Sequence, residues 1–240
     1  MMQPSVAAVV LVMAFACPAL ARGEGQQGAS SPVRREAGRP GSFTLSVGGE
    51  LLTPQGLGST TATMRSNNQQ GTTYRYFVTA GNRVAAPAFR GRVGYNITPM
   101  LTVEGGLVVS RGNVQGKVSA DVENAAPLTV AERMTQYFVD ASVLAHLRQL
   151  AFSNGAGVPF LEAGGGYLRQ LHEGNLAMNT GQIYHLGGGV TYLLLKRPAS
   201  RLTGIAVRAD ARVYIPRKGY SFGRSQQLFA AFGGSLLFTF

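Results

Sequence analysis

The chain has 240 residues, of which 14% are charged, and a formal net charge of +11 at pH 7. A basic balance is common among nucleic-acid-binding proteins, but here the arginines are scattered without interleaved aromatic residues, which argues against a nucleic-acid partner. The sole cysteine, Cys17, excludes a disulfide bond within the chain.

The first 21 residues have the features of an export signal. They carry no charge, include an apolar run from Val6 to Phe15 and end in Ala19-Leu20-Ala21, an A-x-A sequence that a signal peptidase can cut. The run is shorter than the roughly 20 residues of a membrane-spanning helix. We predict a signal peptide over residues 1–21, with a lipidated Cys17 as the alternative. A positive n-region is missing, which leaves open an atypical signal or another start codon.

Residues 22–41 consist mainly of Gly, Pro, Gln, Ser and Arg, and we predict a flexible tail there, because such a segment cannot repay the entropy of folding. From Ser42 onward, apolar and polar residues alternate in eight segments of about 10 to 14 residues, which is typical of strands. These segments are Ser42 to Thr53, Val84 to Ile97, Met100 to Arg111, Thr135 to Arg148, Val158 to Arg169, Gly181 to Leu194, Leu202 to Ile215 and Gln226 to Phe240.

The connectors between these segments alternate in length. The long, polar ones are Pro54 to Arg83, Gly112 to Met134, Gln170 to Thr180 and Pro216 to Ser225. Short turns at one end and long loops at the other, with an even strand number, are typical of outer-membrane barrels. Thr72 to Thr79 alternates enough to extend the first hairpin. Val130 to Leu150 can also be drawn as an amphipathic helix, which would leave seven strands, an odd number unsuited to this type of barrel.

Apart from the arginines that end the third and fifth segments, the charged residues within the segments lie on one face of the alternation. In the seventh segment, for example, Val207, Ala209 and Ala211 oppose charged neighbours. No other stretch is an apolar helical span, so a membrane-embedded chain must close into a barrel. We therefore predict an all-β, eight-stranded antiparallel up-and-down transmembrane β-barrel over residues 42–240, with Tyr184 and Tyr192 in aromatic girdles. A soluble barrel with an aromatic core is the alternative.

The residues on the other face of each segment, opposite the apolar side chains, predict a polar lumen. Buried charges persist when they are paired, and an eight-stranded barrel is just wide enough for side chains to fill it. We predict that the lumen holds an ion-pair network that plugs the barrel, and a gated polar path is the alternative. The network comprises Glu50, Arg90, Arg92, Glu104, Asp140, Glu162, Arg208, Asp210 and Arg212.

The C-terminal segment has an apolar face that ends on an aromatic residue. Alternate residues from Leu228 to Phe240 are apolar, although Phe229 and Leu237 are exceptions on the other face. This pattern resembles the C-terminal signature of bacterial outer-membrane β-barrels, with Gly234 as a departure. The resemblance implies an assembly signal at Phe232, Leu236, Phe238 and Phe240.

The segment from Ser42 to Phe240 resembles the small eight-stranded outer-membrane barrels of the outer-membrane protein A and W types. The resemblance implies a monomer in the outer membrane that contacts lipid and lipopolysaccharide and whose last strand binds the barrel-assembly machinery. It favours a non-enzymatic role in envelope integrity or surface interaction. A channel for small, apolar solutes, as in the W type, is the alternative, and a lipid A modifying enzyme is a third hypothesis.

Catalytic and metal-binding signals are weak in this chain. His172, Glu173 and Ser221 could supply acyl-transfer chemistry, but nothing in the sequence fixes their geometry. The three histidines lie on separate segments, so we predict no metal site and no cofactor. Glycine triplets at residues 164–166 and 187–189 fit close strand approach better than phosphate binding. The arginines of the first long connector, Arg65, Arg75 and Arg83, suggest contact with lipopolysaccharide phosphates or a host surface, or a merely solvated loop.

Overall fold

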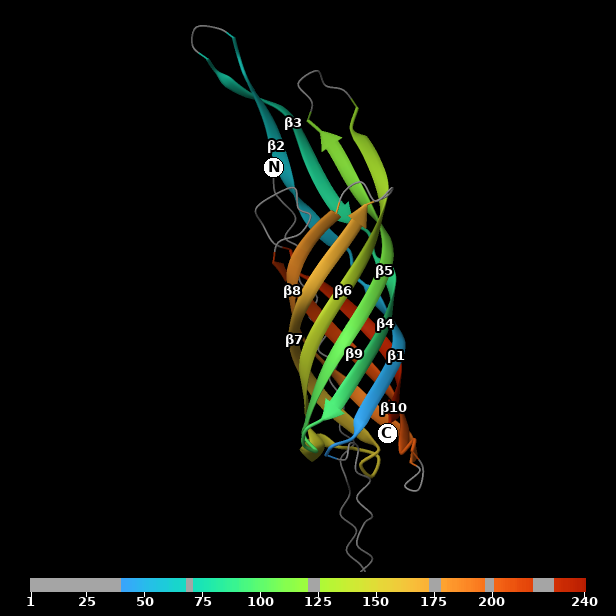
Figure 1. Cartoon of the computed structure of the whole chain (residues 1–240). Coiled ribbons are helices and arrows are strands. Elements are labelled where there is room, and N and C mark those ends of the chain that lie inside the picture. Colours follow the sequence, from blue (N-terminus) through green and yellow to red (C-terminus); the bar gives the residue numbers. More distant parts are fainter. Residues whose placement is uncertain (1–39, 68–70, 121–125, 173–177, 197–200, 218–226) are drawn as a thin grey trace, which may run out of the picture. The chain divides into compact units, whose positions relative to one another are not determined.

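A computed structural model describes residues 40–67, 71–120, 126–172, 178–196, 201–217 and 227–240. These residues are almost entirely strand (Figure 1), and one 3-10 turn, η1, spans Arg148–Leu150. The strands are β1 (Phe43–Leu52), β2 (Gln55–Arg65), β3 (Thr73–Arg83), β4 (Ala86–Asn96), β5 (Leu101–Ser119), β6 (Leu128–His146), β7 (Gly157–His172), β8 (Met178–Lys196), β9 (Gly204–Arg217) and β10 (Phe229–Thr239).

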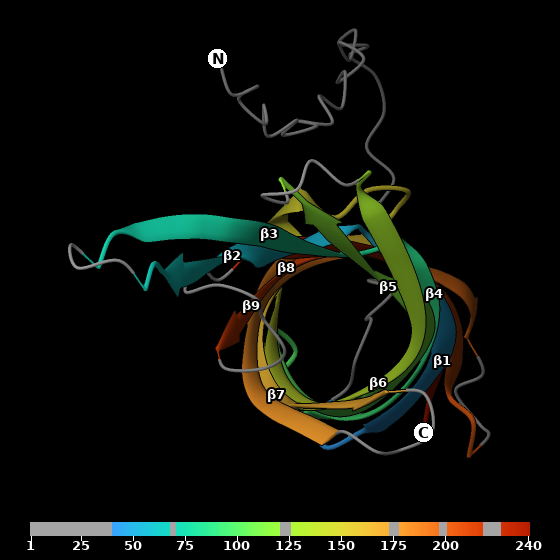
Figure 2. The ribbon, with the colours of Figure 1, turned by 90° about the horizontal axis from the view of Figure 1, so that it is seen from above.

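Eight of these strands close into an antiparallel barrel. Hydrogen-bonded neighbours follow the order β1, β4, β5, β6, β7, β8, β9 and β10, and β10 pairs with β1 from Thr44↔Thr239 to Leu52↔Ala231. Figure 2, seen along the barrel, shows the closed ring. The predicted eight-stranded antiparallel barrel is therefore confirmed. Closure leaves no free edge among the wall strands, so their backbone groups are paired within the protein.

The predicted first connector, Pro54 to Arg83, is wrong as a loop because most of it is the hairpin β2–β3. β3 pairs with the upper part of β5 from Val78↔Ser119 to Arg83↔Val114, so a sheet of β2, β3, β5 and β6 continues beyond the barrel (Figure 1). The predicted connector from Gly112 to Met134 is likewise mostly strand. Both faces of the sheet meet water there, so polar β-formers such as Thr replace the alternation that marks the wall strands.

The helical alternative for Val130 to Leu150 is wrong. β6 runs through nearly all of this segment, and it pairs with β5 along its length and with β7 from Met134 to His146. Flanking strands supply hydrogen-bond partners for β6 on both edges, and its alternate residues face different surroundings, so the sheet overrides the local helical pattern. No helix among the described residues is long and apolar enough to cross a membrane.

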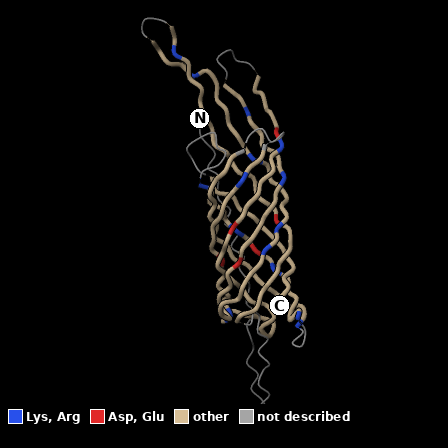
Figure 3. The backbone as a smooth tube through the Cα atoms, in the orientation of Figure 1, with Lys and Arg blue, Asp and Glu red and all other residues tan. Residues whose placement is uncertain are grey.

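The two faces of the barrel wall differ sharply in polarity. Outward side chains are apolar and exposed, for example Tyr167 (70%), Phe89 (61%) and Leu186 (59%). Inward side chains are buried and largely polar. Figure 3 shows the Asp and Glu residues of the wall at mid-height, with Lys and Arg both there and toward the loop end. A continuous apolar exterior around a charged interior is the reverse of a soluble protein.

Candidate functional site

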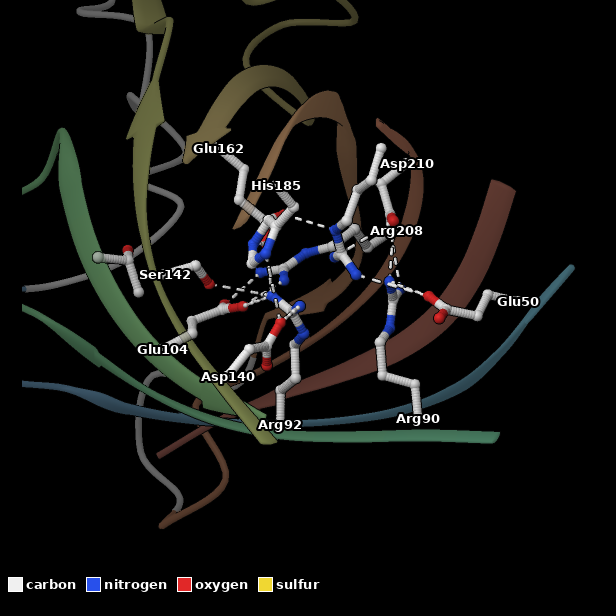
Figure 4. Close-up of polar contacts among 12 residues, drawn as sticks. Glu50, Arg90, Arg92, Glu104, Asp140, Ser142, Glu162, His185, Arg208 and Asp210 are labelled. Atoms are coloured by element: carbon white, nitrogen blue, oxygen red, sulfur yellow. Dashed lines mark hydrogen bonds and ion pairs between the residues drawn. The ribbon is translucent and has the colours of Figure 1, made fainter. Parts of the chain in front are cut away.

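The nine residues that alternation assigns to the lumen are all buried there. Glu50 lies on β1, Arg90 and Arg92 on β4, Glu104 on β5, Asp140 on β6, Glu162 on β7, and Arg208, Asp210 and Arg212 on β9, with exposures between 1% and 8%. Each points inward because it has the parity opposite to the apolar face of its strand. Figure 4 shows the side chains meeting across the barrel, together with Ser142 and His185. We call these eleven residues the lumen network.

Arg92 is the centre of one half of the lumen network. Its Nη1 donates to Glu162 Oε1 at 2.6 Å and to Ser142 Oγ at 3.1 Å, and its Nη2 donates to Asp140 Oδ2 at 2.9 Å. A longer contact of 3.5 Å reaches Glu104 Oε2. One guanidinium on β4 therefore joins carboxylates on β5, β6 and β7 and ties the walls together.

Two bidentate pairs complete the arrangement. Arg208 donates through both terminal nitrogens to Glu104, at 2.8 and 2.7 Å. Arg90 does the same to Asp210, at 2.9 and 2.6 Å, and also donates to Glu50 Oε2 at 3.1 Å. Planar fork-to-fork pairing is the strongest arrangement open to a guanidinium and a carboxylate.

Arg212 joins the carboxylates around Arg92 to those around Arg90, and His185 contacts two of the carboxylates around Arg92. Arg212 Nε donates to Glu162 Oε2 at 3.0 Å, and its terminal nitrogens lie 3.5 Å from Glu50 and 3.2 Å from Asp210. His185 places Nε2 3.1 Å from Glu162 and Nδ1 3.7 Å from Asp140.

The charges of the lumen network nearly cancel. Five carboxylates face four guanidinium groups, so the carboxylates exceed the arginines by one. His185 was not among the predicted network residues, although it has the inward parity of the sixth segment. Its position between two carboxylates depends on the register of β8 against β7, which alternation does not supply.

An apolar layer lies on the loop side of the lumen network. Each of the eight wall strands contributes to it: Leu52, Ala88, Val108, Phe138, Leu168, Ile183, Tyr214, Phe229 and Ala231, all no more than 9% exposed. The ring of Tyr214 stacks on that of Phe229, with centroids 5.0 Å apart, and lies 5.8 Å from that of Phe138. The two layers close the lumen one above the other.

Arg83 caps the apolar layer from the loop side. The sequence pattern placed it in an exposed connector, but it is 1% exposed, and its guanidinium lies 4.3 Å from the ring centroid of Phe229. It donates to Gln136 Oε1 at 2.9 Å and to the Thr53 carbonyl at 3.1 Å. Arg83 is the last residue of β3 and pairs with Val114 on β5. Recognising a strand that ends at Arg83 would have indicated that this residue adjoins the barrel wall.

The residues suggested for catalysis are not brought together in the described part of the chain. His172 ends β7, but its side chain lies outside the described residues, as do Glu173 and Ser221. Among the described residues, no group of three or more His, Cys, Asp and Glu side chains could hold a metal ion.

The sequence matches no protein-family model and no curated protein. Among solved structures, Neisserial surface protein A has 12% identity and a TM-score of 0.50, over 85% of this chain and 100% of that one. The chain has the fold of the small outer-membrane β-barrels. Two further outer-membrane barrels match less well. Outer membrane protein OprG from Pseudomonas aeruginosa has 12% identity and a TM-score of 0.46, over 85% and 98% of the chains. The attachment invasion locus protein Ail of Yersinia pestis has 11% identity and a TM-score of 0.38, over 84% and 100%.

The C-terminal residues of this small outer-membrane-type barrel line the outside of its closing strand. Phe232, Leu236 and Phe240 are 55%, 48% and 49% exposed, and Phe238 is half-buried on the same face. The Phe240 N–H donates to the Phe43 carbonyl at 2.8 Å, so the last residue helps to close the barrel. Recognition of this face by an assembly machinery stays a prediction.

Replacing Phe240 by alanine is expected to lower the amount of assembled barrel in cells several-fold while leaving the refolded protein nearly as stable. Phe43→Ala is the matched control, because Phe43 is 58% exposed on the adjoining strand but lies outside the C-terminal segment. Outer-membrane fractionation with unboiled gels measures the assembled fraction. Equal losses in both variants would show that only apolar area at the rim matters.

Proposed function

We propose that the protein is an integral outer-membrane β-barrel with a closed lumen, which acts without catalysis in envelope integrity or surface interaction. The observation that carries this proposal is the closure of the lumen by two stacked layers, one of ion pairs and one of apolar side chains. The charges are held in ion pairs, and side chains from all eight wall strands fill the apolar layer above them, so a hydrated ion has no continuous polar path through the lumen.

The outer surface supports the membrane location. From the turn end to Val109 on β5, Tyr167 on β7 and Ile215 on β9, every outward position of these strands is Gly, Ala, Pro, an aliphatic residue or an aromatic one. A charge on this face at mid-depth costs about 2–4 kcal/mol in a bilayer, which accounts for the pattern. In water the same surface would be an aggregation hazard.

The sheet beyond the barrel supports surface interaction rather than transport. β2, β3 and the ends of β5 and β6 extend past the wall as a paired sheet, and their side chains are mostly polar (Figure 1). A channel for apolar solutes would have to carry them through the lumen network, where each broken ion pair leaves a buried charge.

Planar-bilayer recording tests the closed lumen. We expect the purified, inserted protein to give no steady conductance above that of the bare bilayer. Insertion is checked separately by faster migration of the unboiled protein on a denaturing gel. Steady conductance, or uptake of solutes by vesicles that contain the protein, would replace this proposal with transport.

Spin labels test the membrane location. A label at Val207, which is 38% exposed on the outward face of β9, is expected to report acyl chains. A label at Arg75, exposed on β3, is expected to report water. A Val207 label in water, or a protein that stays soluble without detergent, contradicts the proposal. Unchanged lipid A mass spectra after expression are expected from a protein without catalytic activity.

A further inference from the structure

At the loop end of the barrel wall, three arginines on alternate strands mark where the outer surface changes from apolar to polar. Arg111 on β5, Arg169 on β7 and Arg217 on β9 are exposed, and each is the first charged outward-facing residue at the loop end of its strand. On all three strands the preceding outward position is apolar or aromatic, so the guanidinium groups stand where the apolar surface stops. We call these three residues the arginine belt.

Strand tilt brings the arginine belt to one level. Hydrogen-bonded rows climb around a tilted barrel. The row that starts at Leu101, the first residue of β5, passes through Ala145 and Leu161 and reaches Gly188, in the middle of β8. Residues at one height on the wall must therefore come from successively lower rows from β5 to β9, where a lower row is one nearer the turn end of a given strand.

The arginine belt makes this shift. Arg111 pairs with Thr135, whereas Arg169 pairs with Tyr137, which is one outward position nearer the turn end of β6. Arg217 lies one row lower again, in the row of Tyr167, because both pair with Gln182 on β8. The downward step on each alternate strand offsets the climb of the rows, so the three guanidinium groups share a level around one side of the wall.

Tyrosines and neutral polar residues accompany the arginine belt. The guanidinium of Arg217 lies 6.0 Å from the ring centroid of Tyr184, and Tyr137 is the cross-strand partner of Arg169. Thr180 and Gln182, exposed on β8 between Arg169 and Arg217, add hydrogen-bond donors. Tyrosine is enriched where hydrocarbon meets head groups, which fixes the level of the belt at the membrane boundary.

Carboxylates do not offset this charge on the outer face that the structure describes. Apart from Glu132 near the loop end of β6, the described Asp and Glu residues lie buried in the lumen network. At the turn end the described cations are Arg148, Lys196 and Arg201, which lie in turns or at a strand end. The two ends therefore differ in the arrangement of their cations, because only the arginine belt stands on the strands at the edge of the apolar surface.

We infer that the arginine belt binds the phosphate groups of the phosphorylated glycolipid in the outer leaflet of the outer membrane. This inference rests on the proposed membrane location. The long stems of the arginines can lie along the acyl region while their guanidinium groups reach head-group level. A guanidinium pairs with phosphate in a bidentate manner, and the tyrosines below it contact the acyl chains.

Lipid A binding to the purified barrel in detergent tests the inference. Native mass spectrometry with diphosphoryl lipid A is compared for the wild type and the triple variant Arg111→Gln, Arg169→Gln, Arg217→Gln. We expect about 100-fold weaker binding, since each cation at a charged membrane surface contributes about a fivefold factor. Monophosphoryl lipid A is expected to bind the wild type more weakly, and inorganic phosphate is expected not to compete at millimolar concentration.

A charge-matched control separates a site from general attraction. The triple variant Arg75→Gln, Lys196→Gln, Arg201→Gln removes the same charge from exposed positions outside the belt and is expected to bind lipid A like the wild type. Equal losses in both variants, or none in the belt variant, overturn the inference. Unboiled gel migration and the Val207 label are expected to be unchanged in both variants, so failure of the belt is distinguishable from failure of the membrane location.

Discussion

Replacing Arg92 by methionine is expected to lower the free energy of unfolding by about 3–5 kcal/mol, because it leaves the buried carboxylate of Asp140 without its arginine and takes one cation from Glu104 and Glu162. The guanidinium of Arg92 is the hydrogen-bond donor to Asp140 and Glu162 at 2.9 and 2.6 Å and is 3.5 Å from Glu104. Methionine is shorter than arginine but has a similar volume, so the loss is of charge and hydrogen bonds more than of volume. Urea unfolding in lipid vesicles, followed by gel migration, measures the difference.

Two companion variants make the Arg92 result specific. Arg92→Lys keeps the charge but not the planar fork and is expected to give an intermediate loss. Arg75→Met removes an arginine from the exposed hairpin and is expected to change the free energy of unfolding by no more than about 0.5 kcal/mol. If Arg92→Met unfolds at the same urea concentration as the wild type, the lumen network does not stabilise the barrel.

The wall strands could be predicted because two different solvents act on their two faces. Lipid outside and a packed lumen inside impose a strict alternation of apolar and polar residues. Alternation therefore assigned Val207 and Arg208, which are neighbours on β9, to opposite faces, and they are 38% and 2% exposed. The same alternation treated Phe229 as an exception on the inward face. Its place in the apolar layer shows that the lumen is not uniformly polar.

The depth of each residue could not be predicted. Parity says that Arg92 and Glu162 both face inward, but their contact across the lumen depends on the register of each strand pair between β4 and β7. The hairpin β2–β3 was predicted only in part, because alternation over Thr72 to Thr79 indicated an extension of the hairpin at β3, whereas β2 was taken as part of a connector. The far end of β2 has water on both faces, as the exposure of both Thr60 and Thr61 shows, so no alternation marks it.

Replacing Gly166 by alanine is expected to destabilise the barrel by about 3 kcal/mol, the upper end of the usual cost of overpacking. Gly166 pairs with Asp140, and a Cβ at this position would overlap the carbonyl oxygen of Val139 and lie 2.6 Å from Asp140 Cα. These neighbours are backbone atoms of β6, so no change of rotamer relieves the overlap and β6 and β7 must separate. The folded fraction on unboiled gels after refolding measures the effect.

Gly91→Ala is the matched control, because it also introduces one methyl group at a wall glycine. A Cβ at Gly91 has no neighbour within 4 Å, so this variant is expected to refold like the wild type. The contrast tests why glycine recurs in these strands. If close approach of β6 and β7 requires Gly166, only that variant fails, whereas equal tolerance of both substitutions would mean that the strands have room for a side chain and that the glycines serve another purpose.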